Sequence, residues 1–183
     1  LPLPNDLFAS ASYFTSGEIG SADKSAISVA GINSAPAGAT AWDRKVWELD
    51  LRYNYGSNGI RPLIPTGDIP KVMLGATYGS FGDDAIGAPE RDGKYWFIEG
   101  LFRLDEKLYG ATRYSVVDLD SGALDKLAGS PVAVNSYRRT SIGLGYALTE
   151  STHLKTEYTI NNTSGGASDP SLNQFAVGIA SKF

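Results

Sequence analysis

The sequence predicts an all-β protein whose antiparallel strands follow one another in a meander. Two observations predict this fold class. In at least six stretches, apolar and polar residues alternate one by one, as expected for strands whose successive side chains point to opposite faces. Between these stretches lie segments rich in Gly, Pro, Asp and Ser, which favour turns and loops. The chain has 183 residues, so we expect residues 1–183 to form a single domain.

The N-terminal part of the chain is weakly patterned. Residues 1–43 are predicted to begin with an irregular segment and to contain two weak strand candidates, at residues 7–16 and 25–33. The alternation becomes strong from residue 44 and continues to residue 183. We therefore expect about eight or nine strands in this chain, most of them in its second part.

The clearest strand is predicted at residues 45–55. Its apolar side chains share one face and its polar side chains the other, in the order Trp47, Leu49, Leu51, Tyr53, Tyr55 against Glu48, Asp50, Arg52, Asn54. The same alternation predicts strands at residues 71–80, 95–104, 108–117, 138–148, 153–161 and 172–183.

The connections differ in length. Residues 81–93, 118–134 and 162–171 are predicted to be loops at one end of the strands, and residues 105–107 and 149–152 to be tight turns at the other. The acidic residues Asp83, Asp84, Glu90 and Asp92 fall in the first loop, where we expect them to be solvated. Residues 56–70 contain three prolines and form a long connection at the end otherwise occupied by tight turns.

The length of the strands and their division into an apolar and a polar face favour a sheet that separates lipid from water. Each strong strand has about ten residues, which is enough to cross a bilayer when tilted. Aromatic residues recur near strand ends, and several polar faces are rich in glycine. These features predict an antiparallel transmembrane β-barrel, either a small closed barrel of its own or the C-terminal part of a larger barrel. The non-membrane alternative is a soluble β-sandwich with its polar faces outward.

Composition excludes several other classes. The chain has no Cys, which excludes disulfides and thiolate metal sites. Its net charge of −4 and pI near 5.0 argue against a nucleic-acid partner. The first residue is Leu, so we expect either that a signal peptide has been removed or that the chain begins partway through a longer protein.

The charged residues with inward parity are the candidate functional residues. In a water-filled pore they would set charge selectivity, whereas in a small closed barrel they would pair across strands and fill the lumen. Arg103, Arg113 and Arg139 would form one basic patch if they lie at the same height. The complete set of pore-lining candidates is Glu48, Asp50, Arg52, Glu99, Arg103, Arg113, Arg139, Lys155 and Glu157.

We expect no catalytic centre, because the single histidine lacks a suitable setting. By parity, His153 lies beside the turn at residues 149–152, which favours a solvated turn residue over a member of a hydrolase triad. We therefore expect no enzyme activity, no cofactor and no metal.

Two runs of residues resemble a known family. Trp47-Glu48-Leu49-Asp50-Leu51-Arg52-Tyr53 resembles a strand of the phosphate-selective-type and related bacterial porins. Leu154-Lys155-Thr156-Glu157-Tyr158, with the following loop and the strand that ends at Phe183, resembles their last hairpin. The resemblance covers roughly the C-terminal three quarters of the chain. A basic phosphate-binding ladder is not evident, so phosphate selectivity is not implied.

The resemblance implies a location in the bacterial outer membrane and a barrel of about sixteen to eighteen strands. It also implies that Phe183 is part of the signal read by the barrel-assembly machinery. Outer-membrane lipid is the expected partner, with a homo-oligomer such as a trimer as the expected assembly. The expected function is a porin for passive diffusion of small hydrophilic solutes or ions. The alternative is a closed eight-stranded barrel with a structural or adhesion role.

Overall fold

The computed structural model describes residues 6–20, 39–56, 70–88, 90–120, 135–149, 152–164 and 171–181. These residues form strands and their connections. The strands are β1 Asp6–Thr15, β2 Ile19–Gly20, β3 Ala41–Tyr55, β4 Val72–Ile86, β5 Arg91–Arg103, β6 Leu108–Leu119, β7 Ser136–Ala147, β8 Thr152–Ser164 and β9 Ser171–Ser181. No helix in these ranges is long and apolar enough to cross a membrane.

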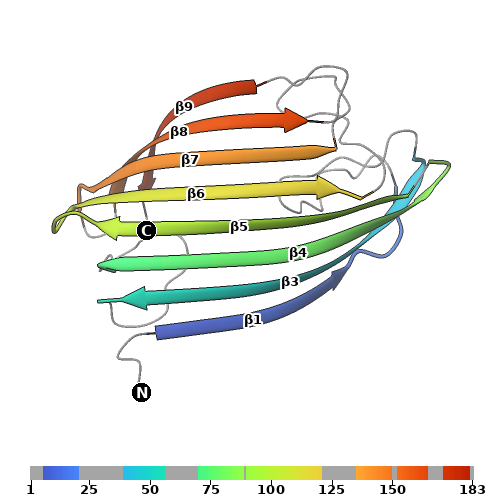
Figure 1. The fold of residues 1–183 in the computed structure, drawn as a ribbon, viewed down its shortest axis with the longest axis horizontal. Coiled ribbons are helices and arrows are strands. Elements are labelled where there is room, and N and C mark those ends of the chain that lie inside the picture. Colours follow the sequence, from blue (N-terminus) through green and yellow to red (C-terminus); the bar gives the residue numbers. More distant parts are fainter. Residues whose placement is uncertain are drawn as a thin grey trace.

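All strands belong to one sheet. Its order is β1-β3-β4-β5-β6-β7-β8-β9, and the short β2 pairs with the start of β3 (Figure 1). Every pair of neighbours is antiparallel. The all-β, antiparallel meander expected from the sequence is therefore confirmed. Within the described residues, β1 and β9 are the two edges of the sheet.

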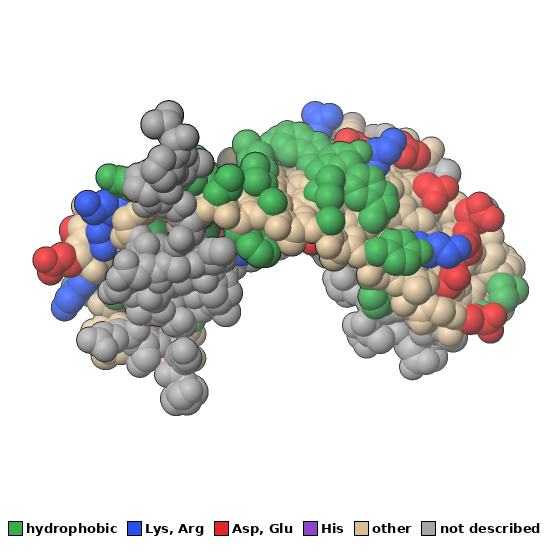
Figure 2. Space-filling view, turned by 90° about the horizontal axis from the view of Figure 1, so that it is seen from below, with side chains coloured by type: hydrophobic (Ala, Val, Ile, Leu, Met, Phe, Trp, Pro, Cys, Tyr) green, Lys and Arg blue, Asp and Glu red, His purple; other side chains and the backbone are tan. Residues whose placement is uncertain are grey.

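The sheet is strongly curved and has two chemically different faces. Figure 2 shows an arch with a hollow beneath it; hydrophobic side chains gather over the middle of its outer surface, and charged side chains lie toward both ends. We call the outer surface the convex face and the hollow side the concave face. The large hydrophobic side chains exposed on the convex face include Trp47, Leu49, Leu51, Leu74, Tyr78, Ile98, Phe102, Ile142, Leu144, Tyr158, Phe175, Val177 and Ile179.

The two faces arise because neighbouring strands pair in phase. Leu49 lies opposite Tyr78, while the next residue along β3, Asp50, lies opposite Thr77. Since strand side chains alternate between faces, one apolar pair and one polar pair fall on opposite sides of the sheet. The other strand pairs, as far as β9, are aligned in the same way. The apolar side chains of all these strands therefore lie on one continuous face.

The predicted loop at residues 81–93 is wrong. β4 continues to Ile86 and β5 begins at Arg91, which leaves residues 87–90 as the connection. Gly87, with a φ of 82°, supplies the left-handed conformation at the start of this connection. The polar composition that suggested a solvated loop belongs to strand residues that pair across the hairpin, such as Asp83 with Arg91.

The two predicted tight turns agree with the strand ends. β5 and β6 are joined at residues 104–107, and β7 and β8 at residues 148–151. β3 ends at Tyr55 and β4 begins at Val72 at the same end of the sheet as these turns. Because β4 and β5 are joined by a short connection at the end predicted to carry long loops, loop length does not separate the two ends of the sheet as cleanly as predicted. The strand candidate at residues 25–33, most of the predicted loops at residues 56–70, 118–134 and 162–171, and the terminal Phe183 lie outside the described residues.

Apolar side chains form two clusters on the concave face of β4–β7, one toward each end of these strands. One cluster consists of Phe81, Tyr95, Val117 and Tyr137, and a second of Met73, Leu101 and Tyr109. The Tyr95 ring lies over Gly79, where a Cβ would be 2.3 Å from its Cζ atom. A glycine at that position lets the ring lie flat along the sheet and reach β3.

Candidate functional site

All nine pore-lining candidates project from the concave face. The register places Glu99 opposite Arg113, Arg139 opposite Ser115, and Glu157 opposite Gly143. Glu48, Asp50 and Arg52 lie on the same side of β3, opposite Gly79, Thr77 and Gly75. The shared inward parity is therefore present in the structure, and their role in lining a pore stays a prediction.

The three arginines do not form a single patch. Arg113 and Arg139 lie on adjacent strands, and their positions along the strands are offset by two residues. Arg139 pairs with Ser115, and Arg113 pairs with Ser141. Arg103 pairs with Tyr109 and lies four residues along β5 from Glu99, the partner of Arg113. Four residues of strand correspond to about 13 Å. The condition of equal height, which the basic-patch hypothesis needed, is therefore not met for Arg103.

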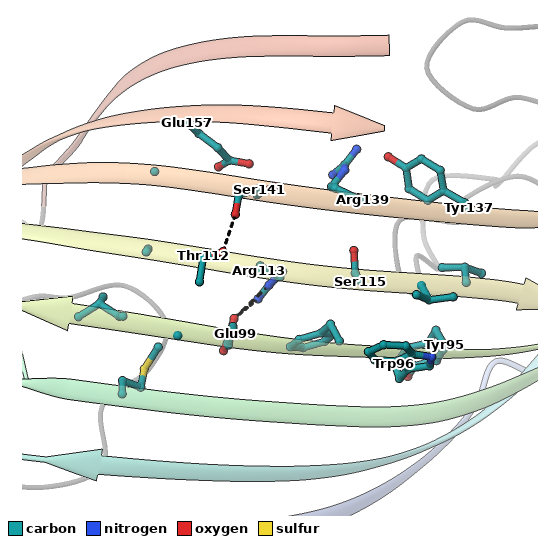
Figure 3. Close-up of a pocket in the computed structure, with 18 residues that line it drawn as sticks. Tyr95, Trp96, Glu99, Thr112, Arg113, Ser115, Tyr137, Arg139, Ser141 and Glu157 are labelled. Carbon is teal, nitrogen blue, oxygen red and sulfur yellow. Dashed lines mark hydrogen bonds and ion pairs between the residues drawn. The ribbon is translucent and has the colours of Figure 1, made fainter. Parts of the chain in front are cut away.

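A cavity of about 610 Å³ lies over β5, β6, β7 and β8 on the concave side (Figure 3). We call it the central cavity. Polar and charged side chains from all four strands line it, namely Glu99, Arg113, Ser115, Arg139, Ser141 and Glu157. The rings of Tyr95, Phe97 and Tyr137 supply apolar surface beside them.

Arg113 and Glu99 form an ion pair in this cavity. Nε and Nη2 of Arg113 donate to the same Glu99 oxygen, Oε2, at 3.0 and 2.5 Å. The guanidinium carbon also lies 4.4 Å from the centre of the Phe97 ring. The Glu99 side chain is 6% exposed and the Arg113 side chain 38% exposed, so the arginine keeps access to the cavity.

Arg139 and Glu157 line the same cavity but are held by neutral partners. Arg139 donates from Nε to Oδ1 of Asn161 at 2.9 Å, and the Tyr137 hydroxyl donates to the same oxygen. Glu157 accepts a hydrogen bond of 2.9 Å from the Thr159 hydroxyl. Neither charge forms a salt bridge with any residue that the structure describes.

A second group of charged side chains lies on β3, β4 and β5, near the end of the sheet where β4 connects to β5. Arg44 donates to Asp83 from Nε at 2.6 Å and from Nη2 at 2.9 Å. Arg91 donates to Asp83 Oδ2 from Nε at 2.8 Å and from Nη2 at 2.7 Å. All three side chains are almost completely buried. We call Arg44, Asp83 and Arg91 the rim cluster.

Aromatic rings enclose the rim cluster. The Arg44 guanidinium lies 4.8 Å from the Trp42 ring centre and 5.5 Å from that of Phe81. Both rings are buried. The predicted solvated role of Asp83 is therefore wrong, whereas its neighbour Asp84 is exposed and pairs with Lys45 at 2.5 Å. Continuing the alternation of β4 through Phe81 and Asp83 would have revealed the inward position of Asp83.

The acidic candidates on β3 are also hydrogen-bonded to neutral side chains. Tyr95 reaches across Gly79 and donates its hydroxyl proton to Glu48 at 2.6 Å. Asp50 accepts from Thr77 at 2.6 Å and from Ser10 at 3.3 Å. These bonds fix the positions of two carboxylates on the concave face and link β1, β3, β4 and β5.

The prediction of a solvated His153 is wrong. His153 is only 2% exposed and lies on the concave face of β8, opposite Ala147 and Ala180. Its ring centre is 6.0 Å from that of Tyr109, in an edge contact. The small partners on both neighbouring strands leave room for the ring against the sheet. Within the described ranges, no group of three or more histidines and carboxylates is placed to hold a metal ion.

Comparisons with protein-family models, curated proteins and solved structures find no match for this chain. We therefore infer the function from the geometry of the two faces and of the central cavity.

Proposed function

We propose that this sheet is part of the wall of an outer-membrane β-barrel and that its concave face lines a water-filled pore for small hydrophilic solutes. The observation that carries the proposal is the continuous apolar convex face backed by a polar, charged concave face. Monomeric soluble proteins rarely expose contiguous apolar patches of this kind. A transmembrane barrel requires them, since its outer face contacts hydrocarbon and its inner face contacts water.

Aromatic residues on the convex face support the membrane location. Trp47 contacts Tyr78 with ring centres 5.4 Å apart, and Trp96 contacts Tyr114 at 5.5 Å. Tyr78 and Trp96 are direct partners, so these four residues form a line across β3 to β6. Tyr55, Phe102 and Tyr146 lie near the C-terminal ends of β3, β5 and β7, at one end of the sheet. Aromatic residues on both sides of an apolar band are typical of the two interfaces of a membrane barrel.

The open edges favour a larger barrel over a closed one of eight strands. In the described part of the chain, β1 pairs only with β3 and β9 only with β8. The concave side chains of β9, including Gln174 and Ala176, are exposed. Closure of eight strands would bring an opposite wall close enough to cover them.

Conductance in planar bilayers tests the pore. The closed barrel that contains this sheet, purified from native membranes, is expected to conduct ions. Replacing Arg113 and Arg139 by Gln is expected to shift the reversal potential toward cation selectivity, because both positive charges lie beside the permeation path. Replacing Glu48 by Gln and Asp50 by Asn is expected to shift it the opposite way. Both shifts should be larger at low salt, where screening is weak. A closed, membrane-inserted barrel that never conducts would contradict the pore.

Two neighbouring residues on β3 test the assignment of faces. Leu51→Arg places a charge on the apolar face, where it is expected to lower the free energy of unfolding by about 2–4 kcal/mol near the bilayer midplane. Arg52→Leu changes the concave face and should have a much smaller effect. Denaturant titration in lipid vesicles measures both variants. Equal losses would show that the two faces do not meet different solvents.

A further inference from the structure

We propose that the central cavity binds a zwitterion of dipeptide size, with the ligand carboxylate on Arg139 and the ligand ammonium on Glu157. The inference rests on the proposed pore for the route by which such a solute reaches the cavity. It names the solute class that the proposed function left open.

The charges that line the cavity leave one cation and one anion unneutralised. Glu99 and Arg113 neutralise each other through their ion pair. Arg139 and Glu157 instead bond to Asn161 and Thr159, which carry no charge. A guanidinium has five N–H donors, and Arg139 uses one of them on Asn161, so it keeps donors for a ligand carboxylate.

The spacing of the two side chains that anchor these charges matches the ends of a short peptide. The Glu157 carboxylate is anchored at Thr159 and the Arg139 guanidinium at Asn161, and both anchors face inward from β8. Two residues of strand separate the anchors, which corresponds to about 7 Å. An extended dipeptide also spans about 7 Å between its ends. A free α-amino acid carries its two charges much closer together and would reach only one anchor well.

The cavity has space and further donors where such a ligand would lie. Gly143 is the partner of Glu157 on β7, and Ala111 lies beyond it on β6, so small residues form this part of the wall. Ser115, the partner of Arg139 on β6, offers a hydroxyl to the ligand carboxylate. The rings of Phe97 and Tyr137 offer apolar surface to the ligand side chains.

Both charges are tethered in place, which keeps them available to a ligand. Arg139 is fixed by Asn161 and lies 5.4 Å from the centre of the Tyr137 ring. Glu157 is fixed by Thr159. A single anion or cation would engage only one of the two charges, whereas a zwitterion engages both without changing the net charge of the cavity.

Titration calorimetry with the refolded chain in detergent micelles tests the site. The probes are alanyl-alanine, its N-acetylated amide, in which both charges are removed, and free alanine. Alanyl-alanine is expected to bind at least about tenfold more tightly than either of the others, because loss of one charge-assisted hydrogen bond alone has that effect. Equal affinity for the capped and uncapped dipeptide, or no binding of alanyl-alanine, would overturn the proposal.

Variants locate the two ends of the ligand. Arg139→Gln and Glu157→Gln are each expected to weaken alanyl-alanine binding about tenfold. The double exchange of Arg139→Glu with Glu157→Arg should restore binding, because the dipeptide can turn around. Arg103→Gln is the matched control, since Arg103 lies outside the cavity, and should leave binding unchanged. If Arg103→Gln weakens binding as much as Arg139→Gln, general electrostatic attraction explains the result and the site is refuted.

The calorimetry and the conductance measurement test the binding site and the pore separately. Conductance without dipeptide binding would refute the zwitterion site and leave the pore standing. Dipeptide binding without conductance would refute the pore and leave a binding site on the concave face.

Discussion

The rim cluster and the central cavity combine arginine with carboxylate on the same concave face, yet they differ in access to solvent. In the rim cluster, two arginines converge on Asp83, which is 0% exposed. In the cavity, Arg113 binds Glu99 while 38% of its side chain stays exposed, and Arg139 and Glu157 have neutral partners. The first arrangement is closed to solvent and joined by four hydrogen bonds to Asp83, and the second keeps donors and acceptors for other molecules.

The difference shows that inward parity does not by itself define a functional charge. A buried charge that is fully bonded inside the protein stabilises one arrangement of strands, and its removal leaves its partners buried and uncompensated. A half-exposed charge contributes less to stability, because water replaces a lost partner. The rim cluster therefore connects β3, β4 and β5, while the cavity charges face the space where a solute would pass.

The largest effect is expected from breaking the rim cluster. Asp83→Asn removes the negative charge shared by Arg44 and Arg91 and leaves two buried guanidinium groups facing each other. We expect the free energy of unfolding to fall by about 3–5 kcal/mol. Denaturant titration measures the loss, and Asp84→Asn serves as the control because that exposed carboxylate should change stability little. Similar stability of the two variants would show that the rim cluster does not hold the sheet.

A smaller effect is expected in the cavity. Glu99→Gln removes the charged partner of Arg113 and is expected to lower the free energy of unfolding by about 1.5–3 kcal/mol. The loss should stay below that of Asp83→Asn, because the freed guanidinium can turn toward water. The same titration compares the two variants. If Glu99→Gln lowers the free energy of unfolding as much as Asp83→Asn or more, water does not compensate Arg113 for its lost partner.

The smallest effect is expected at Asp105, an exposed carboxylate in the turn between β5 and β6. Its Oδ1 accepts backbone N–H bonds from Lys107 and Leu108, both at 2.7 Å, which lower the Asp105 pKa below its usual 3.8. A lowered pKa in the folded protein means that the stabilisation is present above pH 3.8 and is lost as the pH falls through the folded value. Asp105→Ala should therefore destabilise the protein at pH 7, and much less at pH 2. Unfolding midpoints at the two pH values measure this, and a pH-independent difference would contradict it.

The sequence by itself determined the fold class, most strands and the face on which each side chain lies. The alternation from Trp47 to Tyr55 is local, since the backbone sends successive side chains to opposite sides whatever the partner strand is. For this reason the nine charged candidates could be assigned to one face before any register was known. Strand ends were less certain, and polar residues such as Asp83 looked like a loop because their partners lie on other strands.

Only the tertiary structure decided which of these side chains meet. Arg44 contacts Asp83 across 39 positions of sequence, and Arg139 is bound by Asn161 rather than placed level with Arg103. Such contacts depend on strand register, which is set jointly by the pairing of all the strands. The same is true of His153, whose burial depends on small partners in two neighbouring strands. Alternation has a fixed local period and can be read along one strand, whereas register and the cavity it creates exist only between strands.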